Sequence, residues 1–189
     1  MLKEKAREYF REKRSALSEQ QRMKNDDLLL IQFQALAFPS ITFLLSFWPL
    51  EETQEPNTHL FTDYLEFLNP EMVLCYPKTD FNSISMHAIR TNDDTRFRKN
   101  QYNIYEPEDG EAVNAAALDM IFVPLLAVDK KGYRVGYGKG FYDRYLSQCR
   151  RGCMKIGFCY FEPLEAIEDR HDFDLPLDLC VTPAAVYEF

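Results

Sequence analysis

The spacing of apolar and polar residues along the chain predicts alternating helices and strands. A helix is expected over the basic N-terminal segment, and Ser18-Glu19-Gln20-Gln21 resembles a capping box that opens a second helix toward Leu36. Asn57-Thr58 is suited to cap a third helix that runs through Leu68. Strands are expected where β-branched, aromatic or continuous apolar residues concentrate, over residues 40–48, 72–76, 84–89, 117–124, 155–160 and 179–181, whereas residues 92–100 read as a polar loop.

This alternation predicts an α/β fold with a mainly parallel sheet, helices on both of its faces, and a basic N-terminal helix. A chain of 189 residues is long enough to bury a core of its own. It contains no internal repeat, low-complexity tract or convincing linker, so we expect a single domain over residues 1–189.

Composition narrows the class of protein. No apolar stretch approaches the length of a membrane span, and the charged N-terminus lacks the apolar core of a signal peptide, so we expect a cytoplasmic protein without a membrane partner. The five cysteines include no C-x-x-C pair, which favours free thiols over a disulfide framework or a zinc site. A net charge of −8 argues against a general nucleic-acid binder.

Glycine is the residue that changes this picture most. Four of the seven glycines fall within nine residues, Gly132, Gly136, Gly138 and Gly140. Glycine allows positive φ and lets backbone amides approach a ligand closely. Arg134, Lys139 and Arg144 add positive charge between and after the glycines, and Asp143 adds an oxygen ligand. This combination favours a loop that binds phosphates with a divalent cation, although a glycine-rich turn held by packing alone stays open.

The loop matches neither common nucleotide motif. A Walker loop needs a glycine five residues before its Gly-Lys pair and a hydroxyl after it, but Tyr133 and Gly140 occupy these positions. The dinucleotide fingerprint also fails, because residues 136–140 read G-x-G-x-G. The location is more informative, since the glycines lie between a predicted strand at 117–124 and a helix that begins at Phe141. Ligands bind at such junctions in α/β folds.

The residues of this loop and its surroundings resemble the 5-formyltetrahydrofolate cyclo-ligase family, also called 5,10-methenyltetrahydrofolate synthetases. The resemblance rests on Val123-Pro124, Asp129, Gly132-Tyr133-Arg134, Gly136-Tyr137-Gly138 and Gly140-Phe141-Tyr142-Asp143-Arg144, and it continues through Asn103-Ile104-Tyr105-Glu106-Pro107, Ile156-Gly157 and Asp174-Leu175-Pro176-Leu177-Asp178. Two positions depart from the pattern. Leu125 stands where the family often has glycine, and Lys139 replaces a frequent glycine.

The resemblance gives the N-terminal helix a second interpretation. Residues 1–24 carry a net charge of +4, and Lys3, Arg7, Arg11 and Arg14 would share one helix face. Taken alone, this stripe is typical of a solvated face with ion pairs. The resemblance implies that Lys3 and Arg7 contact ATP, and it leaves Arg11 and Arg14 as solvated residues.

The resemblance also implies the other site residues. Arg134 and Lys139 are the expected catalytic residues. The ATP site is expected to comprise Lys3, Arg7, Arg134, Gly136, Tyr137, Gly138, Lys139, Gly140, Phe141 and Tyr142. The folate site is expected to comprise Leu50, Glu55, Tyr102, Tyr137, Gly138, Lys139, Gly140 and Phe141, with Glu55 accepting hydrogen bonds from the pterin. For any single aromatic residue outside the glycine loop, a core position is the competing interpretation.

The implied metal is Mg²⁺, with Asp143 and Asp174 as ligands. Composition alone would make the segment with Asp169, Asp172 and Asp174 a solvated acidic loop, and Asp172 stays an alternative to Asp174. Magnesium is commonly held by one or two carboxylates together with phosphate oxygens and water.

The activity that the resemblance implies is ATP-dependent closure of 5-formyltetrahydrofolate to 5,10-methenyltetrahydrofolate. We expect the protein to be a monomer and to act on small molecules only. Two other functions stay open, a non-catalytic nucleotide- or folate-binding paralogue and a metal-dependent phosphohydrolase that uses Asp143, Asp174 and Asp178. The paralogue would be expected to have lost the loop arginine or the metal carboxylate, yet Arg134 and Asp143 are both present.

Overall fold

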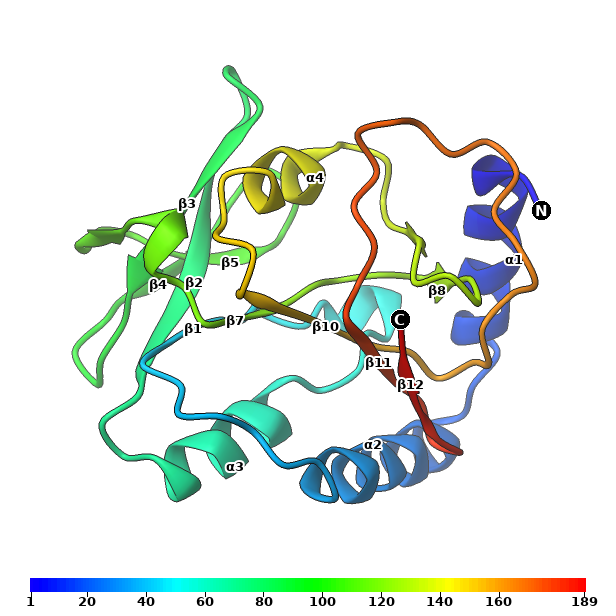
Figure 1. The fold of residues 1–189 in the computed structure, drawn as a ribbon, viewed down its shortest axis with the longest axis horizontal. Coiled ribbons are helices and arrows are strands. Elements are labelled where there is room, and N and C mark those ends of the chain that lie inside the picture. The colour runs from blue at the N-terminus through cyan, green and yellow to red at the C-terminus, as the bar shows by residue number, and fades with distance from the viewer.

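The computed structural model describes all residues from Met1 to Phe189, and an eight-stranded sheet forms its centre (Figure 1). The strand order is β12-β11-β10-β7-β1-β2-β3-β6. In chain order these strands are β1 (Phe43–Leu45), β2 (Val73–Asp80), β3 (Ser85–Arg90), β6 (Ala112–Val113), β7 (Met120–Phe122), β10 (Met154–Phe158), β11 (Leu179–Val181) and β12 (Val186–Glu188). The five strands from β11 to β2 run parallel, and β12, β3 and β6 are antiparallel to their neighbours. The predicted α/β class and mainly parallel sheet are confirmed.

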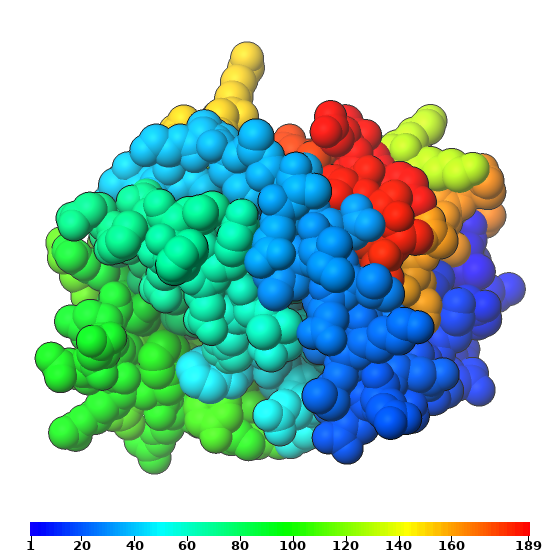
Figure 2. All heavy atoms as spheres, turned by 90° about the horizontal axis from the view of Figure 1, so that it is seen from below, coloured from blue at the N-terminus to red at the C-terminus, as the bar shows by residue number.

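Four helices flank this sheet: α1 (Lys3–Ser15), α2 (Glu19–Gln34), α3 (His59–Leu68) and α4 (Phe141–Leu146). Helices α2 and α3 cover one face, where Phe33 and Phe61 pack in one core with Leu44 and Met120 (Figures 1 and 2). Helix α4 lies on the other face, where its Tyr145 joins Leu45 and Ile121 in a second core. The neighbouring strand residues Leu44 and Leu45 thus point to opposite faces of the sheet. The prediction of helices on both faces is confirmed. No helix is both long and apolar enough to cross a membrane.

Two of the helices begin as the sequence predicts, by different devices. Ser18 forms the expected capping box, in which its side chain accepts from the Gln21 N–H and the Gln21 side chain accepts from the Ser18 N–H. Helix α3 begins at His59, but Thr58 does not cap it, because the Thr58 hydroxyl donates to the Phe47 carbonyl at 2.7 Å. Asn57 supplies the acceptor for the first N–H, at 3.2 Å from His59 N.

The strands near the functional region are shorter than the sequence predicts, and some were not expected. Only Phe43–Leu45 of the segment 40–48 and Met120–Phe122 of the segment 117–124 are strands. The predicted loop at 92–100 is wrong at Phe97–Lys99, which forms β4 and pairs with β5 (Tyr105–Pro107). Strands β8 (Ala127–Val128) and β9 (Arg134–Val135) form a further hairpin, and η1 (Glu51–Thr53) and η2 (Ala115–Ala117) are 3₁₀ turns. The short strands β1 and β7 are parallel neighbours that end side by side, so the long loops that follow them leave the sheet at the same edge.

The five cysteines occur as free thiols. Four of them are buried, and burial raises the pKa of Cys75 to about 12, so this thiol stays protonated at neutral pH. The four buried thiols therefore behave as small apolar core residues.

Leu125, which departs from the family pattern, packs against Gly157 in β10. Its side chain is buried, and a Cβ on Gly157 would overlap Leu125 Cδ2 and stand 2.7 Å from Leu177 Cδ1. The missing Cβ at Gly157 therefore leaves the space that the Leu125 side chain uses.

We predict that Gly157→Ala destabilises the protein by about 1–3 kcal/mol, since one added carbon overpacks a filled core. For a chain of this size, thermal unfolding should show a lower melting temperature by about 2–4 °C per kcal/mol. The loss should be smaller in a Leu125→Ala background, which opens the space from the other side. Equal melting temperatures for the wild type and Gly157→Ala would contradict this packing.

Candidate active site

The glycine-rich segment, residues 123–140, lies between β7 and α4, as predicted, and contains the β8–β9 hairpin (Figure 1). At three of its positions the backbone conformation favours glycine, because Gly132, Gly138 and Gly140 have φ of 81°, 89° and 74°. Gly140 is also the residue that precedes the first turn of α4. The segment therefore reaches the amino end of α4 through backbone conformations that other residues rarely adopt.

Helix α1 packs against this segment through its apolar side. Ala6 and Phe10 share a small core with Leu126, Ala127 and Val135 of the hairpin. This packing fixes the rotation of α1 about its axis, so the basic stripe of the helix faces the glycine-rich segment.

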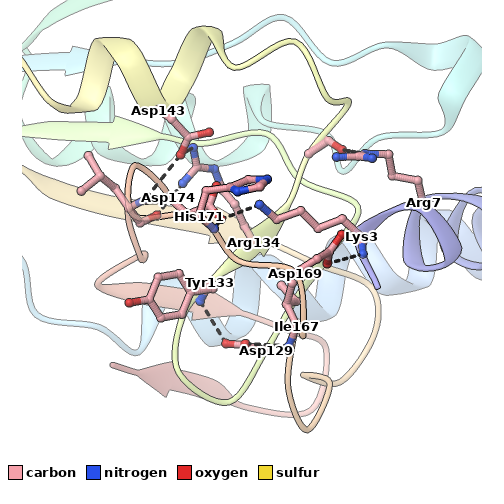
Figure 3. Close-up of polar contacts among 12 residues, drawn as sticks. Lys3, Arg7, Asp129, Tyr133, Arg134, Asp143, Ile167, Asp169, His171 and Asp174 are labelled. Carbon is pink, nitrogen blue, oxygen red and sulfur yellow. Dashed lines mark hydrogen bonds and ion pairs between the residues drawn. The ribbon is translucent and has the colours of Figure 1, made fainter. Parts of the chain in front are cut away.

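Lys3 and Arg7 consequently meet the residues that the sequence associates with ATP and metal (Figure 3). The Lys3 ammonium pairs with Asp174 Oδ2 at 2.5 Å. The Arg7 Nε donates to the Gly136 carbonyl at 3.0 Å. The Arg7 guanidinium also borders Gly138, where an added Cβ would come within 3.4 Å of it. Arg7 thus lies beside the glycines, and Lys3, one helical turn away, lies beside Asp174.

Arg134 joins α4 to the segment that carries Asp174 (Figure 3). Its Nη2 pairs with Asp143 Oδ1 at 2.7 Å, and its Nη1 donates to the Leu175 carbonyl at 2.6 Å. The Leu175 N–H lies 3.4 Å from the same Asp143 oxygen. Arg134 therefore brings the two predicted carboxylates into one neighbourhood, although they lie 31 positions apart in sequence.

The two carboxylates have the donor chemistry that Mg²⁺ requires, but they do not form a complete cage. No group of three or more metal-ligating side chains is present. The contacts above occupy Oδ1 of Asp143 and Oδ2 of Asp174, which leaves one oxygen of each carboxylate without a hydrogen-bond partner. One or two carboxylates suffice where phosphate oxygens and water complete the coordination, so these residues fit a magnesium ion that arrives with ATP.

The local contacts separate Asp174 from its sequence alternative, Asp172. Burial tends to raise the pKa of Asp174, but hydrogen bonds from Lys3 and from the His171 N–H outweigh it and lower that pKa. Asp172 is exposed and makes no hydrogen bond. The geometry favours Asp174 as the second carboxylate of the site.

Arg14 is the clearest error of the sequence interpretation. It was expected to be solvated, but it is 1% exposed and lies under the glycine-rich segment. Its Nη2 donates to the Leu125 carbonyl at 2.6 Å, and its Nη1 donates to the Tyr137 hydroxyl at 3.2 Å. Arg11 is exposed, as expected, with its guanidinium 5.9 Å from the centre of the Tyr137 ring. The even spacing of the basic stripe placed both residues on this face, but it did not reveal which one would be covered.

The predicted folate residues Leu50, Glu55 and Tyr137 form one hydrogen-bonded group. The Glu55 carboxylate accepts from the Leu50 N–H at 2.8 Å and from the Tyr137 hydroxyl. Thr53 Oγ1 lies 3.5 Å from the same hydroxyl. Burial raises the pKa of Glu55, although the hydrogen bonds and the Arg14 charge oppose that rise. The loop after β1 and the glycine-rich segment therefore meet at a buried carboxylate.

Tyr102 lies on the other side of the glycine-rich segment. Its ring is half exposed, and the Lys139 ammonium stands 5.3 Å from the ring centre. Phe81, at the tip of the β2–β3 hairpin, has its ring centre 4.8 Å from that of Tyr102 and 5.5 Å from that of Phe141. An open row of aromatic rings thus runs beside Lys139.

The sequence interpretation missed an aromatic group around Trp48. The ring centre of Trp48 lies 4.8 Å from that of His59, 4.9 Å from Tyr105 and 5.0 Å from Phe97. Burial lowers the pKa of His59, so its imidazole is neutral at pH 7. The only tryptophan of the chain, at the end of the predicted strand 40–48, was the available signal. Its partners come from α3, β4 and β5, whose meeting no local pattern indicates.

Tyr142 occupies the interior of the site. Its hydroxyl is buried and has no hydrogen-bond partner. Burial raises its pKa, so the phenol stays neutral. Such an atom gains from any ligand that brings an acceptor to it.

A family model and one curated relative match nearly the whole chain, whereas another curated relative matches less than half of it. The family model for the 5-formyltetrahydrofolate cyclo-ligase family matches residues 2–183. The 5-formyltetrahydrofolate cyclo-ligase of Mycoplasma pneumoniae is 28% identical over 186 residues, which cover 96% of this chain and 98% of that protein. That of Mycoplasma genitalium is 39% identical over 82 residues, which cover 42% of this chain and only 50% of that protein.

A solved structure extends the match to three dimensions. The NMR structure of 5,10-methenyltetrahydrofolate synthetase from Aquifex aeolicus superimposes with a TM-score of 0.79 at 31% sequence identity, and the match covers 100% of this chain and 93% of that one. The family model and this structure agree with the family that the motifs of the glycine-rich segment indicate and with the observed fold. The chain belongs to the 5-formyltetrahydrofolate cyclo-ligase family.

Proposed function

We propose that this protein closes 5-formyltetrahydrofolate to 5,10-methenyltetrahydrofolate with ATP and Mg²⁺, releasing ADP and phosphate, and that it works as a monomer on small molecules. One observation carries the proposal beyond family membership. Two cations of α1, the glycine-rich segment and the Arg134–Asp143 pair gather at the carboxyl ends of β1 and β7, with a buried carboxylate on one side and partly exposed aromatic rings on the other.

The chemistry of the substrate explains why ATP is needed. The formyl group on N5 is amide-like, so its carbon is a poor electrophile and its oxygen a poor leaving group. Transfer of the γ-phosphoryl group of ATP to the formyl oxygen makes that oxygen a good leaving group. N10 then attacks the formyl carbon, the ring closes with loss of the N10 proton, and phosphate departs with the oxygen. The resulting C=N⁺ bond is the methenyl bridge.

The residues of the chain position the two substrates and stabilise charge. The backbone amides of Gly138 and Gly140 and the Lys139 ammonium bind the triphosphate from one side, and Lys3 and Arg7 bind it from the other. Arg134 stabilises the charge that spreads over the phosphoryl oxygens during transfer. Holding both substrates in line replaces a protein nucleophile, and this geometry supplies much of the rate.

Asp143 and Asp174 would hold Mg²⁺ through the carboxylate oxygens that make no other hydrogen bond. When bound, the ion neutralises charge on the phosphate oxygens. Lys3 keeps Asp174 ionised, and Arg134 keeps Asp143 directed toward the same region.

On the folate side, Glu55 accepts hydrogen bonds from the pterin, while Leu50 and Tyr137 fix the orientation of its carboxylate. Tyr102 and Phe141 offer flat surfaces to the rings of the substrate. The glycine-rich segment, with Gly136, Gly138 and Gly140, lies between both substrates and forms part of each site.

The decisive experiment follows the absorbance of methenyltetrahydrofolate after the purified protein is mixed with 5-formyltetrahydrofolate, ATP and Mg²⁺. We expect a rise that requires ATP and metal. Release of phosphate is measured in parallel, and it should equal the methenyl product and depend on folate.

The two alternatives give different results in this experiment. Phosphate release from ATP without folate would identify a phosphohydrolase. A flat absorbance trace from folded protein that still binds ATP would identify a non-catalytic paralogue. Either result would overturn the proposed activity.

A further inference from the structure

Arg14 is a buried cation whose presence needs a reason. It lies in the last turn of α1, and its guanidinium is covered by the glycine-rich segment. Its two terminal nitrogens donate to the Leu125 carbonyl and the Tyr137 hydroxyl, but its Nε has no partner. Burial of a charge costs several kcal/mol unless an anion and hydrogen bonds compensate. No carboxylate pairs with Arg14 directly, so the compensating anion must act through an intervening residue.

Glu55 is that anion, and Tyr137 connects the two. The Tyr137 hydroxyl accepts a hydrogen bond from Arg14 Nη1 and donates one to Glu55 Oε1. The second Glu55 oxygen is held by the Leu50 N–H at 2.8 Å. The Glu55 residue is itself buried, with 7% of its surface exposed. Burial is the main cause that raises the pKa of Glu55, and the positive charge of Arg14 is among the causes that lower it.

The other titratable groups around Glu55 carry no positive charge. Tyr137 and Tyr142 face it from the glycine-rich segment and from α4, and burial keeps both phenols neutral. The Tyr160 hydroxyl stands 3.5 Å from the Glu55 main-chain oxygen and donates to Asp26 of α2. Arg14 is the cation that acts on this carboxylate. Removal of Arg14 would weaken the opposition to desolvation, which favours the protonated form of Glu55, and would leave the hydrogen bonds from Tyr137 and the Leu50 N–H as the contacts that lower its pKa.

We propose that Arg14 is a positioning residue for folate binding, which acts through Tyr137 to keep the Glu55 carboxylate ionised and aimed at a flat heterocycle that offers two N–H donors. This role rests on the proposed function, because that function supplies the heterocycle. A protonated Glu55 could accept only one of the paired hydrogen bonds well, so the charge state of Glu55 sets the affinity. Arg14 itself does not touch the substrate.

The test is the binding of 5-formyltetrahydrofolate without ATP, measured by calorimetry from pH 5.5 to 8.5, for the wild type and Arg14→Met. Methionine keeps much of the length of the side chain and removes its charge. We expect the rise in Kd to reach about tenfold at the acidic end of this range, the equivalent of one pKa unit. The rise should be larger at lower pH, and the pH at which binding is half lost should move upward. ATP affinity should change less than twofold.

Two controls isolate the role of the charge. Arg11→Met removes an exposed cation from the same helix and should leave the folate Kd and its pH profile unchanged. In a Glu55→Gln background no carboxylate titrates, so Arg14→Met should add no further pH dependence. If Arg14→Met does not fold, Tyr137→Phe serves instead, because loss of the connecting hydroxyl should move the pH profile in the same direction.

The outcomes separate this proposal from the proposed function. An unchanged pH profile, or equal losses of folate and ATP affinity at every pH, would overturn the role of Arg14 and leave the function intact. A wild type that binds folate without turning it over would overturn the function, while the pH profile of binding still tests Arg14. A wild type that does not bind 5-formyltetrahydrofolate would overturn both.

Discussion

Arg134→Ala is expected to lower kcat/KM by about 10³-fold or more, since a fixed arginine that stabilises a moving phosphoryl group contributes on the order of 10³–10⁵ in rate. The side chain is only 6% exposed, so solvent would not replace its charge with the same geometry. The substitution would also release Asp143 and the Leu175 carbonyl, which Arg134 holds at 2.7 Å and 2.6 Å. Steady-state kinetics with both substrates measures this effect.

The fold should survive this change. The side chain of Asp143 is 30% exposed, so its carboxylate can be hydrated once Arg134 is gone. Circular dichroism and the melting temperature check this point. Arg134→Lys keeps the charge but cannot reach both partners with one planar group, so we expect it to stay at least about tenfold below the wild type.

An exposed arginine provides the matched control for Arg134. Arg151→Ala removes the same side chain type from the surface turn before β10 and should leave turnover within about twofold of the wild type. Near-normal turnover of Arg134→Ala would exclude this arginine from the mechanism.

The sequence predicts the local parts of the fold and of the candidate site well. The capping box at Ser18, the start of α4 at Phe141 and the positive φ of Gly138 and Gly140 follow from residue types over a few positions. The clustering of glycines and cations identified the glycine-rich segment. Helical spacing placed Lys3 and Arg7 on one face of their helix.

The parts that were missed depend on contacts between distant segments. Arg14 looks like the other cations of its stripe, and its burial is decided by Leu125 and Tyr137, more than 100 positions away. The residues of β4 alternate poorly, and this strand forms because β5 offers it backbone partners. The order of the eight strands is likewise absent from any local pattern, although it determines that the loops after β1 and β7 leave the sheet side by side.

A second large effect is expected for Asp143→Asn. Asparagine keeps the shape of the side chain and an oxygen that can still accept from Arg134, but it removes the charge that attracts a hard cation. We expect kcat/KM to fall at least about 100-fold, since even partners that only orient metal ligands are worth 10–100-fold. The Mg²⁺ concentration that gives half the maximal rate should rise, and high Mg²⁺ should restore part of the activity.

Binding provides a readout for Asp143 that does not depend on turnover. Ligand that binds only the folded state raises the melting temperature, so Mg²⁺ added to the wild type with ATP should raise it further than ATP alone. Asp143→Asn should lose most of that additional rise. Asp172→Asn is the matched control, because Asp172 is exposed and unpaired in the same acidic segment as Asp174, and its metal dependence should equal that of the wild type. If Asp143→Asn retained the wild-type response to Mg²⁺, Asp143 would act only as the ion-pair partner of Arg134, and the metal would have to be held by Asp174 and the phosphates.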